Sequence, residues 1–109
     1  MPTNPPINEL WEILVPANWN HGRKIDNYHH YNWDNQIRQI TGGLTILPVN
    51  KGQWDHENEI YRDRMIPVRI ACTEEQMKEI INLTLDHYFD QKAIMAYRIS
   101  DKVIIQERA

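Results

Sequence analysis

Two kinds of apolar spacing alternate along the chain. Short apolar runs predict strands at 11–15, 43–49, 60–71 and 92–100. Longer segments with apolar residues three and four positions apart predict helices at 25–41 and 73–89. The polar segments 17–24 and 50–58 predict loops. The predicted order is therefore strand, helix, strand, loop, strand, helix and strand.

The second predicted helix has the clearest local signals. Thr73 and Gln76 have the spacing of a capping box, in which each side chain bonds the backbone N–H of the other residue. A one-sided stripe follows at Met77, Ile80, Ile81, Thr84, Leu85 and Tyr88. The first helix has several asparagines, which lower helix propensity, and Gly42-Gly43 predict its end.

This order is the ferredoxin-like βαββαβ pattern of an α+β fold, an antiparallel sheet with two helices on one face. A turn at Asp101-Lys102 predicts a further short C-terminal strand at 103–106. Residues 1–8 contain several prolines, which predicts a flexible N-terminal arm. Residues 9–109 are long enough to form the core of a single domain. Apolar residues occur on both faces of the strands, too many to leave one face in water, so we expect an oligomer.

Charge and composition exclude several classes of function. The net charge of −3, with no basic run, argues against a nucleic-acid duplex as partner. No apolar stretch approaches the roughly 20 residues that span a bilayer, and the first residues lack the features of a signal peptide. We therefore expect no membrane partner and a cytoplasmic location. The lone Cys72 lies in an apolar run, which fits a buried residue in a reducing compartment.

The sequence offers no motif for a metal or a cofactor. His29 and His30 are adjacent, so on a helix they point about 100° apart and cannot share one ion. The remaining histidines are scattered, although His29 or His30 is a candidate to face a subunit cleft. No catalytic triad, P-loop, dinucleotide fingerprint or paired-carboxylate motif is visible. We expect neither a metal nor a cofactor.

The stretch GGLTILPVNKGQW and the residues after it predict a ligand loop. The candidate cluster is Lys51, Gln53, Trp54, Glu57, Glu59, Tyr61 and Arg62. An aromatic face stacks a purine, an amide reads its edge, and Lys or Arg meets a phosphate or carboxylate. The alternative is that the tryptophan packs on a neighbour while the charges form a solvated loop. In a trimer, Arg62, Arg64 and Arg69 on the next strand are candidates to close ion pairs between subunits or to bind an anion.

The ferredoxin-like order, the motif GGLTIL, the long 50–58 loop and the strand-forming tail together resemble the PII (GlnB-like) superfamily over about residues 9–106. The resemblance implies a homotrimer in which the sheets face inward and ligands lie in clefts between subunits. It also implies that the loop after the second strand responds to the ligand.

Within that superfamily, the tract YRDRMIPVRIACTEEQ…DQKAIMAYRIS is similar to phage S-adenosylmethionine lyases, which form methylthioadenosine and homoserine lactone. The matching positions are Tyr61, Arg62, Val68, Arg69, Ile70, Gln91, Tyr97, Arg98 and Ser100. This similarity implies Gln91 and Arg98 as ligand contacts. It also implies a catalytic glutamate near the start of the third strand, for which Glu57 and Glu59 are the candidates, with Tyr61 beside them. Tyr97 and Arg98 are consecutive in a strand and must point to opposite faces.

Three functions fit these observations. The first is binding of an adenine-containing small molecule between the subunits of a homotrimer, as a sensor or a phage-type sequestering protein. The second is S-adenosylmethionine cleavage, which requires Glu57 or Glu59 at the substrate. The third is a protein-interaction module that docks through the 50–60 loop.

Overall fold

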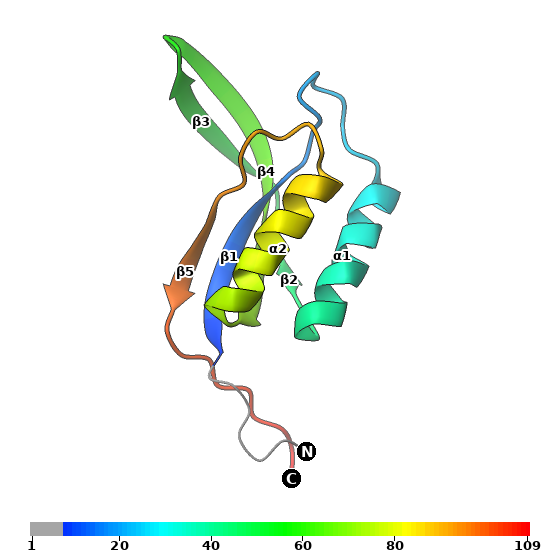
Figure 1. Cartoon of the computed structure of the whole chain (residues 1–109), viewed down its shortest axis with the longest axis vertical. Coiled ribbons are helices and arrows are strands. Elements are labelled where there is room, and N and C mark those ends of the chain that lie inside the picture. Colours follow the sequence, from blue (N-terminus) through cyan, green and yellow to red (C-terminus); the bar gives the residue numbers. More distant parts are fainter. Residues whose placement is uncertain (1–7) are drawn as a thin grey trace.

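The computed structural model describes residues 8–109 as an antiparallel sheet with both helices on one of its faces (Figure 1). The elements are β1 (Glu9–Pro16), α1 (Asn27–Thr41), β2 (Thr45–Ile46), β3 (Asn50–His56), β4 (Glu59–Cys72), α2 (Glu74–His87) and β5 (Ala96–Ser100). The strand order is β2-β4-β1-β5, and β3 pairs with the first half of β4. The predicted α+β, ferredoxin-like fold is therefore confirmed.

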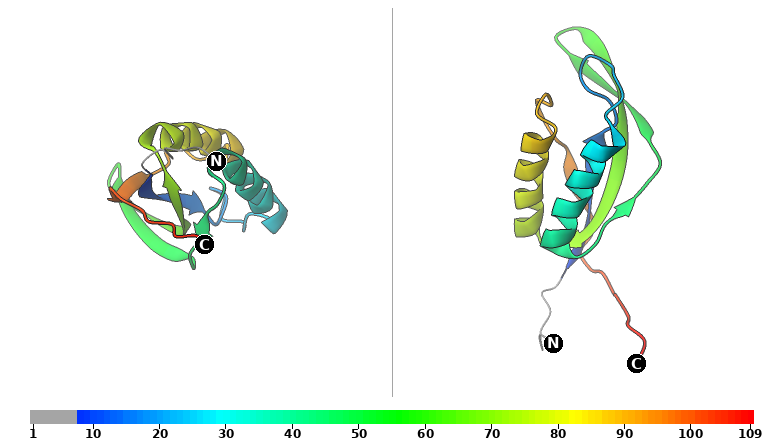
Figure 2. Two further views of the ribbon diagram at one scale, coloured as in Figure 1. Left: turned by 90° about the horizontal axis from the view of Figure 1, so that it is seen from below. Right: turned by 90° about the vertical axis from the view of Figure 1, so that its right-hand side faces the viewer.

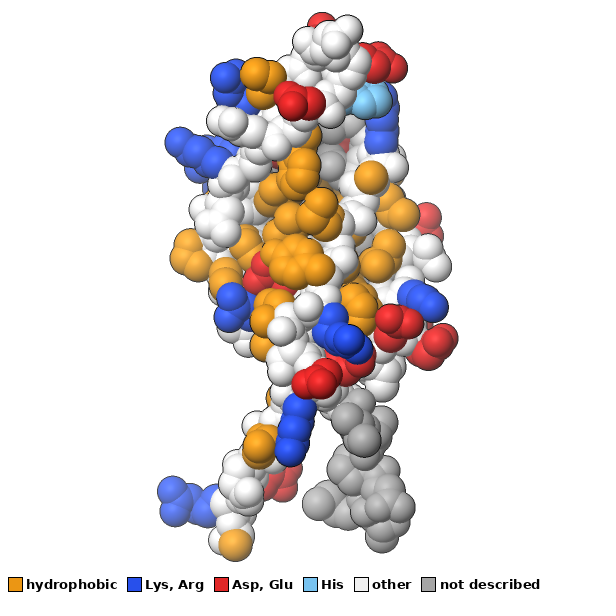
Figure 3. Space-filling view, turned by 90° about the vertical axis from the view of Figure 1, so that its left-hand side faces the viewer, with side chains coloured by type: hydrophobic (Ala, Val, Ile, Leu, Met, Phe, Trp, Pro, Cys, Tyr) orange, Lys and Arg blue, Asp and Glu red, His pale blue; other side chains and the backbone are white. Residues whose placement is uncertain are grey.

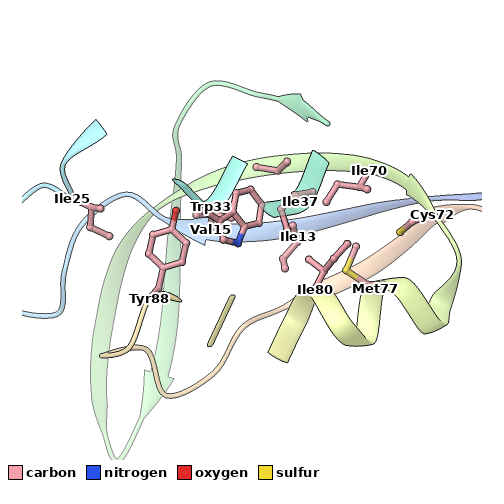
Figure 4. Close-up of a cluster of buried hydrophobic side chains, with 11 residues drawn as sticks. Ile13, Val15, Ile25, Trp33, Ile37, Ile70, Cys72, Met77, Ile80 and Tyr88 are labelled. Carbon is pink, nitrogen blue, oxygen red and sulfur yellow. The ribbon is translucent and has the colours of Figure 1, made fainter. Parts of the chain in front are cut away.

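The core lies between the helices and the alternate residues of β1 and β4 that face them. Ile13 stands opposite Val68 in the register of these two strands, and Val15 stands opposite Ile66. Figure 4 shows the side chains of the strands and both helices meeting in one cluster. Trp33 of α1 is buried there, and its indole N–H donates to the Thr84 hydroxyl of α2 at 3.0 Å. This bond satisfies the polar atom of the largest core side chain.

Local signals fix the ends of both helices. The Thr73 hydroxyl accepts the Gln76 N–H at 3.1 Å and the Gln76 side chain accepts the Thr73 N–H at 3.0 Å, so the predicted capping box is confirmed. At α1 the Asp26 carboxylate accepts the Tyr28 N–H. Gly42 ends α1 with a φ of 85°, and its N–H reaches the Arg38 carbonyl.

The main error of the sequence prediction lies in residues 50–58, which were expected to be a loop. They form β3 and a tight turn onto β4, with Trp54 directly opposite Tyr61. Glu57 and Asn58 both have positive φ, 52° and 67°, as in the type I′ turn that joins two twisted strands. The resulting hairpin projects past the ends of the helices (Figure 2). We call residues 50–65 the β3–β4 hairpin.

Three further boundaries differ from the prediction. The strand expected at 43–49 is reduced to β2, and the strand expected from 92 begins at Ala96. The strand predicted at 103–106 does not form; the tail runs away from the sheet with Ile104 and Ile105 exposed, because no described strand lies beside it. The arm predicted at 1–8 falls, except for Asn8, outside the described residues.

Candidate functional site

The sheet face opposite the helices is open in the single chain. By strand alternation it carries Leu10, Glu12 and Leu14 of β1, Met65, Pro67, Arg69 and Ala71 of β4, and Tyr97 and Ile99 of β5. Neither helix covers it, since both pack on the other face, although Pro67 is fully buried within it. Figure 3 views the β5 side and shows hydrophobic side chains gathered in a band up its middle. Exposed apolar patches rimmed by polar residues are candidate contact surfaces.

A polar network crosses the centre of that open face. Glu12 is only 7% exposed although it is a carboxylate in the middle of a strand. The Arg69 Nε donates to one of its oxygens at 3.0 Å, and the Tyr97 hydroxyl donates to the other. The hydrogen bond to Glu12 raises the pKa of Tyr97, so this hydroxyl stays protonated. Three strands, β4, β1 and β5, are thereby joined on one face.

The predicted ligand cluster is divided between the two faces of the β3–β4 hairpin. Trp54 and Tyr61 stand opposite each other in the strand register, on the face continuous with the open sheet, and they are 38% and 46% exposed. Lys51 and Gln53 point to the other face, where Gln53 stands opposite Arg62. The aromatic and cationic parts therefore do not meet around one ligand within a single chain.

The predicted catalytic glutamates lie at the tip of the same hairpin. Glu57 occupies the turn, its side chain is 83% exposed, and it contacts His56 at 3.6 Å. Glu59 is the first residue of β4 and stands opposite His56. Tyr61 follows on the same face, with its ring centroid 6.1 Å from that of His56. In the isolated chain these groups face solvent, so any site they form includes atoms from outside the chain.

Gln91 and Arg98, the other two predicted ligand contacts, both have partners within the chain. The Gln91 amide donates to Asn20 at 3.1 Å, which ties the loop after α2 to the loop after β1. Arg98 forms an ion pair with Glu9 at 2.8 Å across β5 and β1. Arg98 pairs with Trp11 and Tyr97 with Glu12, which confirms that consecutive residues of β5 point to opposite faces.

A histidine cluster joins the start of α1 to the end of α2. His29 and His87 donate from Nε2 to each other's backbone carbonyls at 2.7 and 2.6 Å, with ring centroids 3.9 Å apart. His30 Nδ1 lies 2.6 Å from the hydroxyl of the fully buried Tyr88. Burial lowers the pKa of His30 and of His87, so both rings are held neutral. The cluster is a structural clasp between the helices.

Sequence reasoning missed Glu12, and also Lys24, which lines a pocket together with Arg64 at the base of the β3–β4 hairpin. The only sequence signal for Glu12 was a charge inside the apolar run at 11–15. Lys24 had no signal, because it lies in a polar loop of ordinary composition. Among residues 8–109, no group of three or more His, Cys, Asp or Glu side chains is arranged to hold a metal ion. No helix in the described part of the chain is long and apolar enough to cross a membrane.

These features define a small α+β protein with the GlnB-like ferredoxin fold, an open sheet face and a projecting hairpin. No protein-family model matches the chain, and no curated protein matches it in sequence. Solved structures do match it in fold. The divalent cation tolerance protein CutA1 from Thermus thermophilus has a TM-score of 0.59 at 12% identity, covering 94% of this chain and 88% of that one.

A phage S-adenosylmethionine lyase in complex with S-methyl-5'-thioadenosine is similar with a TM-score of 0.62 at 10% identity, again covering 94% and 88% of the two chains. CutA from Synechococcus elongatus has a TM-score of 0.58 at 9% identity over 86% of this chain and 76% of its own. At these identities the similarity establishes a common fold for the three proteins and this chain.

Proposed function

We propose that the protein is a cytoplasmic homotrimer that binds an adenine-containing small molecule in clefts between its subunits. The observation that carries the proposal is the open sheet face. It combines exposed apolar side chains with Glu12, a carboxylate whose two oxygens are already satisfied. Such a surface can enter an interface without leaving a buried charge unpaired. The PII-like resemblance implies trimers whose sheets face inward, an arrangement that would cover this face.

The divided hairpin supports a ligand site between subunits. Trp54 and Tyr61 lie on one face of the hairpin, and Lys51 and Arg62 lie on the other. A hairpin placed between two copies presents its aromatic face to one cleft and its cationic face to the next. Each cleft then receives aromatic groups and cations from different chains, the combination that recognises a purine and its anionic substituent.

Two measurements test this proposal. Light scattering at micromolar concentration is expected to give three times the 13.1 kDa chain mass; a monomer would refute the subunit cleft. Liquid chromatography–mass spectrometry of heat-released extract, after incubation with adenine nucleotides, cyclic nucleotides and S-adenosylmethionine, is expected to recover a bound ligand. Trp54→Ala is expected to lose it, whereas Trp19→Ala, which alters an aromatic group packed on His29 and Phe89, serves as the control.

S-Adenosylmethionine cleavage is the second candidate, favoured by the similarity to a lyase bound to S-methyl-5'-thioadenosine. In this reaction the substrate carboxylate attacks the methylene carbon bonded to the sulfonium. The C–S bond breaks, its electron pair passes to sulfur, and homoserine lactone and neutral methylthioadenosine form. The protein's contribution is therefore to hold the reactive conformation and match the changing charge. Glu57, Glu59 and Tyr61 are the proposed catalytic groups. If these groups are catalytic, the wild-type protein is expected to form methylthioadenosine from S-adenosylmethionine. The Glu57→Gln or Glu59→Gln variant is expected to lose this activity. Retention of no small molecule would leave the hairpin as a protein-docking surface.

A further inference from the structure

A pocket of about 370 Å³ lies where the loop after β1, the start of α1 and the base of the β3–β4 hairpin meet. Its lining consists of Ala17, Asn18, Lys24, Asn27, His30, Val49, Arg64 and Ile66. The backbone holds these elements together: the Ala17 N–H donates to the Arg64 carbonyl at 2.9 Å, and the Ile25 N–H donates to the Ala17 carbonyl at 3.0 Å. Pockets that bind small molecules begin at about this volume.

The ionisable side chains that line this pocket are all basic. Lys24 and Arg64 line it together with His30, and none of the eight lining residues is an aspartate or glutamate. The ion pairs among the described residues are Glu57–His56, Glu12–Arg69, Glu74–Lys78 and Glu9–Arg98, and none of them involves Lys24 or Arg64. Lys24 and Arg64 are both exposed and line the same concave place, so the pocket carries positive charge in a chain whose net charge is −3.

The cationic surface extends from the pocket along the hairpin. Arg64 stands directly opposite Lys51, and Arg62 lies on the same face two residues away. Like charges directly opposite each other destabilise a strand pair, so this arrangement costs stability in the free protein. A bound anion between the cations would remove that cost.

His30 lines the pocket and has one ring nitrogen available as a hydrogen-bond donor. Its Nδ1 is engaged by the Tyr88 hydroxyl, and no hydrogen bond within the described chain uses its Nε2. When Tyr88 donates to Nδ1, the neutral ring carries its proton on Nε2. The charged or titratable groups around the ring are Lys24, Asp26, His29, His87 and Tyr88. Burial and the neighbouring His29, His87 and Lys24 lower the pKa of His30, and only Asp26 opposes them.

We propose that this pocket binds the anionic group, a phosphate or a carboxylate, of the small molecule that the protein holds. Lys24 and Arg64 supply the charge, and Asn27 supplies an amide donor, whereas the Asn18 amide already donates to the Gly22 carbonyl at 2.8 Å. The proposal rests on the small-molecule binding function above and specifies its ligand as an anion. The adjoining Lys51 and Arg62 continue the cationic surface on the same face of the hairpin.

Isothermal titration of the full chain with inorganic pyrophosphate and, separately, with citrate distinguishes a phosphate ligand from a carboxylate ligand. Lys24→Gln and Arg64→Gln are each expected to weaken the preferred anion by about 10- to 150-fold, the effect of one charge-assisted hydrogen bond. Lys102→Gln and Arg108→Gln, on the exposed tail, are the matched controls and are expected to leave binding unchanged. Absence of binding by both anions, or equal binding by all variants, overturns the proposal.

A second measurement reports on the pocket itself. NMR titration of the His30 ring with sulfate, whose charge is constant near neutral pH, is expected to raise the pKa of His30, because an anion favours the imidazolium. An unchanged His30 titration in saturating sulfate would refute an anion in the pocket. If an adenine ligand is retained equally by wild type and Arg64→Gln, the proposed function stands and the anion site fails. If pyrophosphate binds through Arg64 and no adenine compound is retained, the anion site stands and the proposed binding of an adenine compound fails.

Discussion

Replacing Arg69 by methionine tests whether the polar network holds the open sheet face together. The substitution keeps the aliphatic stem but removes the cation that donates to Glu12 at 3.0 Å. The Glu12 side chain is 10% exposed and that of Arg69 is 45% exposed, so solvent screens the Arg69 charge but hardly reaches the Glu12 carboxylate. Breaking a buried pair costs about 3–5 kcal/mol, and a surface pair about 0–1 kcal/mol. We therefore expect Arg69→Met to lower the free energy of unfolding by roughly 1–3 kcal/mol.

The assay is urea unfolding followed by tryptophan fluorescence, at one fixed protomer concentration because assembly contributes to stability. A double-mutant cycle with Glu12→Gln isolates the pair, and a coupling energy of about 1–2 kcal/mol is expected. Tyr97→Phe removes the second donor and is expected to cost about 1 kcal/mol. A change below about 0.5 kcal/mol for Arg69→Met, with no coupling to Glu12, would refute the reasoning from burial.

Three other predictions concern the core, a helix end and pH. Thr84→Val leaves the buried N–H of Trp33 without an acceptor and is expected to cost about 1–3 kcal/mol in urea unfolding; a neutral result would mean that another acceptor replaces it. Gly42→Ala is expected to cost about 1 kcal/mol, because the φ of 85° is strained for alanine although nothing crowds the position, while Gly43→Ala serves as the control. The pKa values of His30 and His87 are lowered in the folded protein, so the unfolded chain binds more protons at these two residues. The melting temperature is therefore expected to fall as the pH drops below about 6.5, and a flat profile from pH 8 to 5 would contradict it.

The helices and the central strands could be predicted because their signals are local. For α2 the capping box and the apolar stripe lie within one segment, and the structure starts the helix at Glu74, directly after its cap. The β3–β4 hairpin could not be predicted in the same way. Asn50–His56 is polar, and its turn uses Glu57 and Asn58 instead of the glycine that usually marks a type I′ turn. Pairing with β4 determines its structure, against its own composition.

The candidate sites show the same limit. Glu12 meets Arg69 and Tyr97, which lie 57 and 85 positions away, so the network depends on the register of three strands. Spacing along the chain predicted that Tyr97 and Arg98 face opposite ways, but not what each contacts. The Lys24–Arg64 pocket likewise joins residues from a loop and a distant strand. No local pattern in the sequence contains that information.

Within residues 8–109, the outer part of the β3–β4 hairpin has no third strand, because β1 pairs with β4 only from Met65 to Cys72. Two-stranded ribbons are at best marginally stable in water. This segment can therefore separate while the core stays intact, and its amide protons should exchange with solvent through local opening. A ligand bound in a cleft beside the hairpin is then expected to slow the hydrogen exchange of the β3 amides, while the exchange of the core strands stays unchanged.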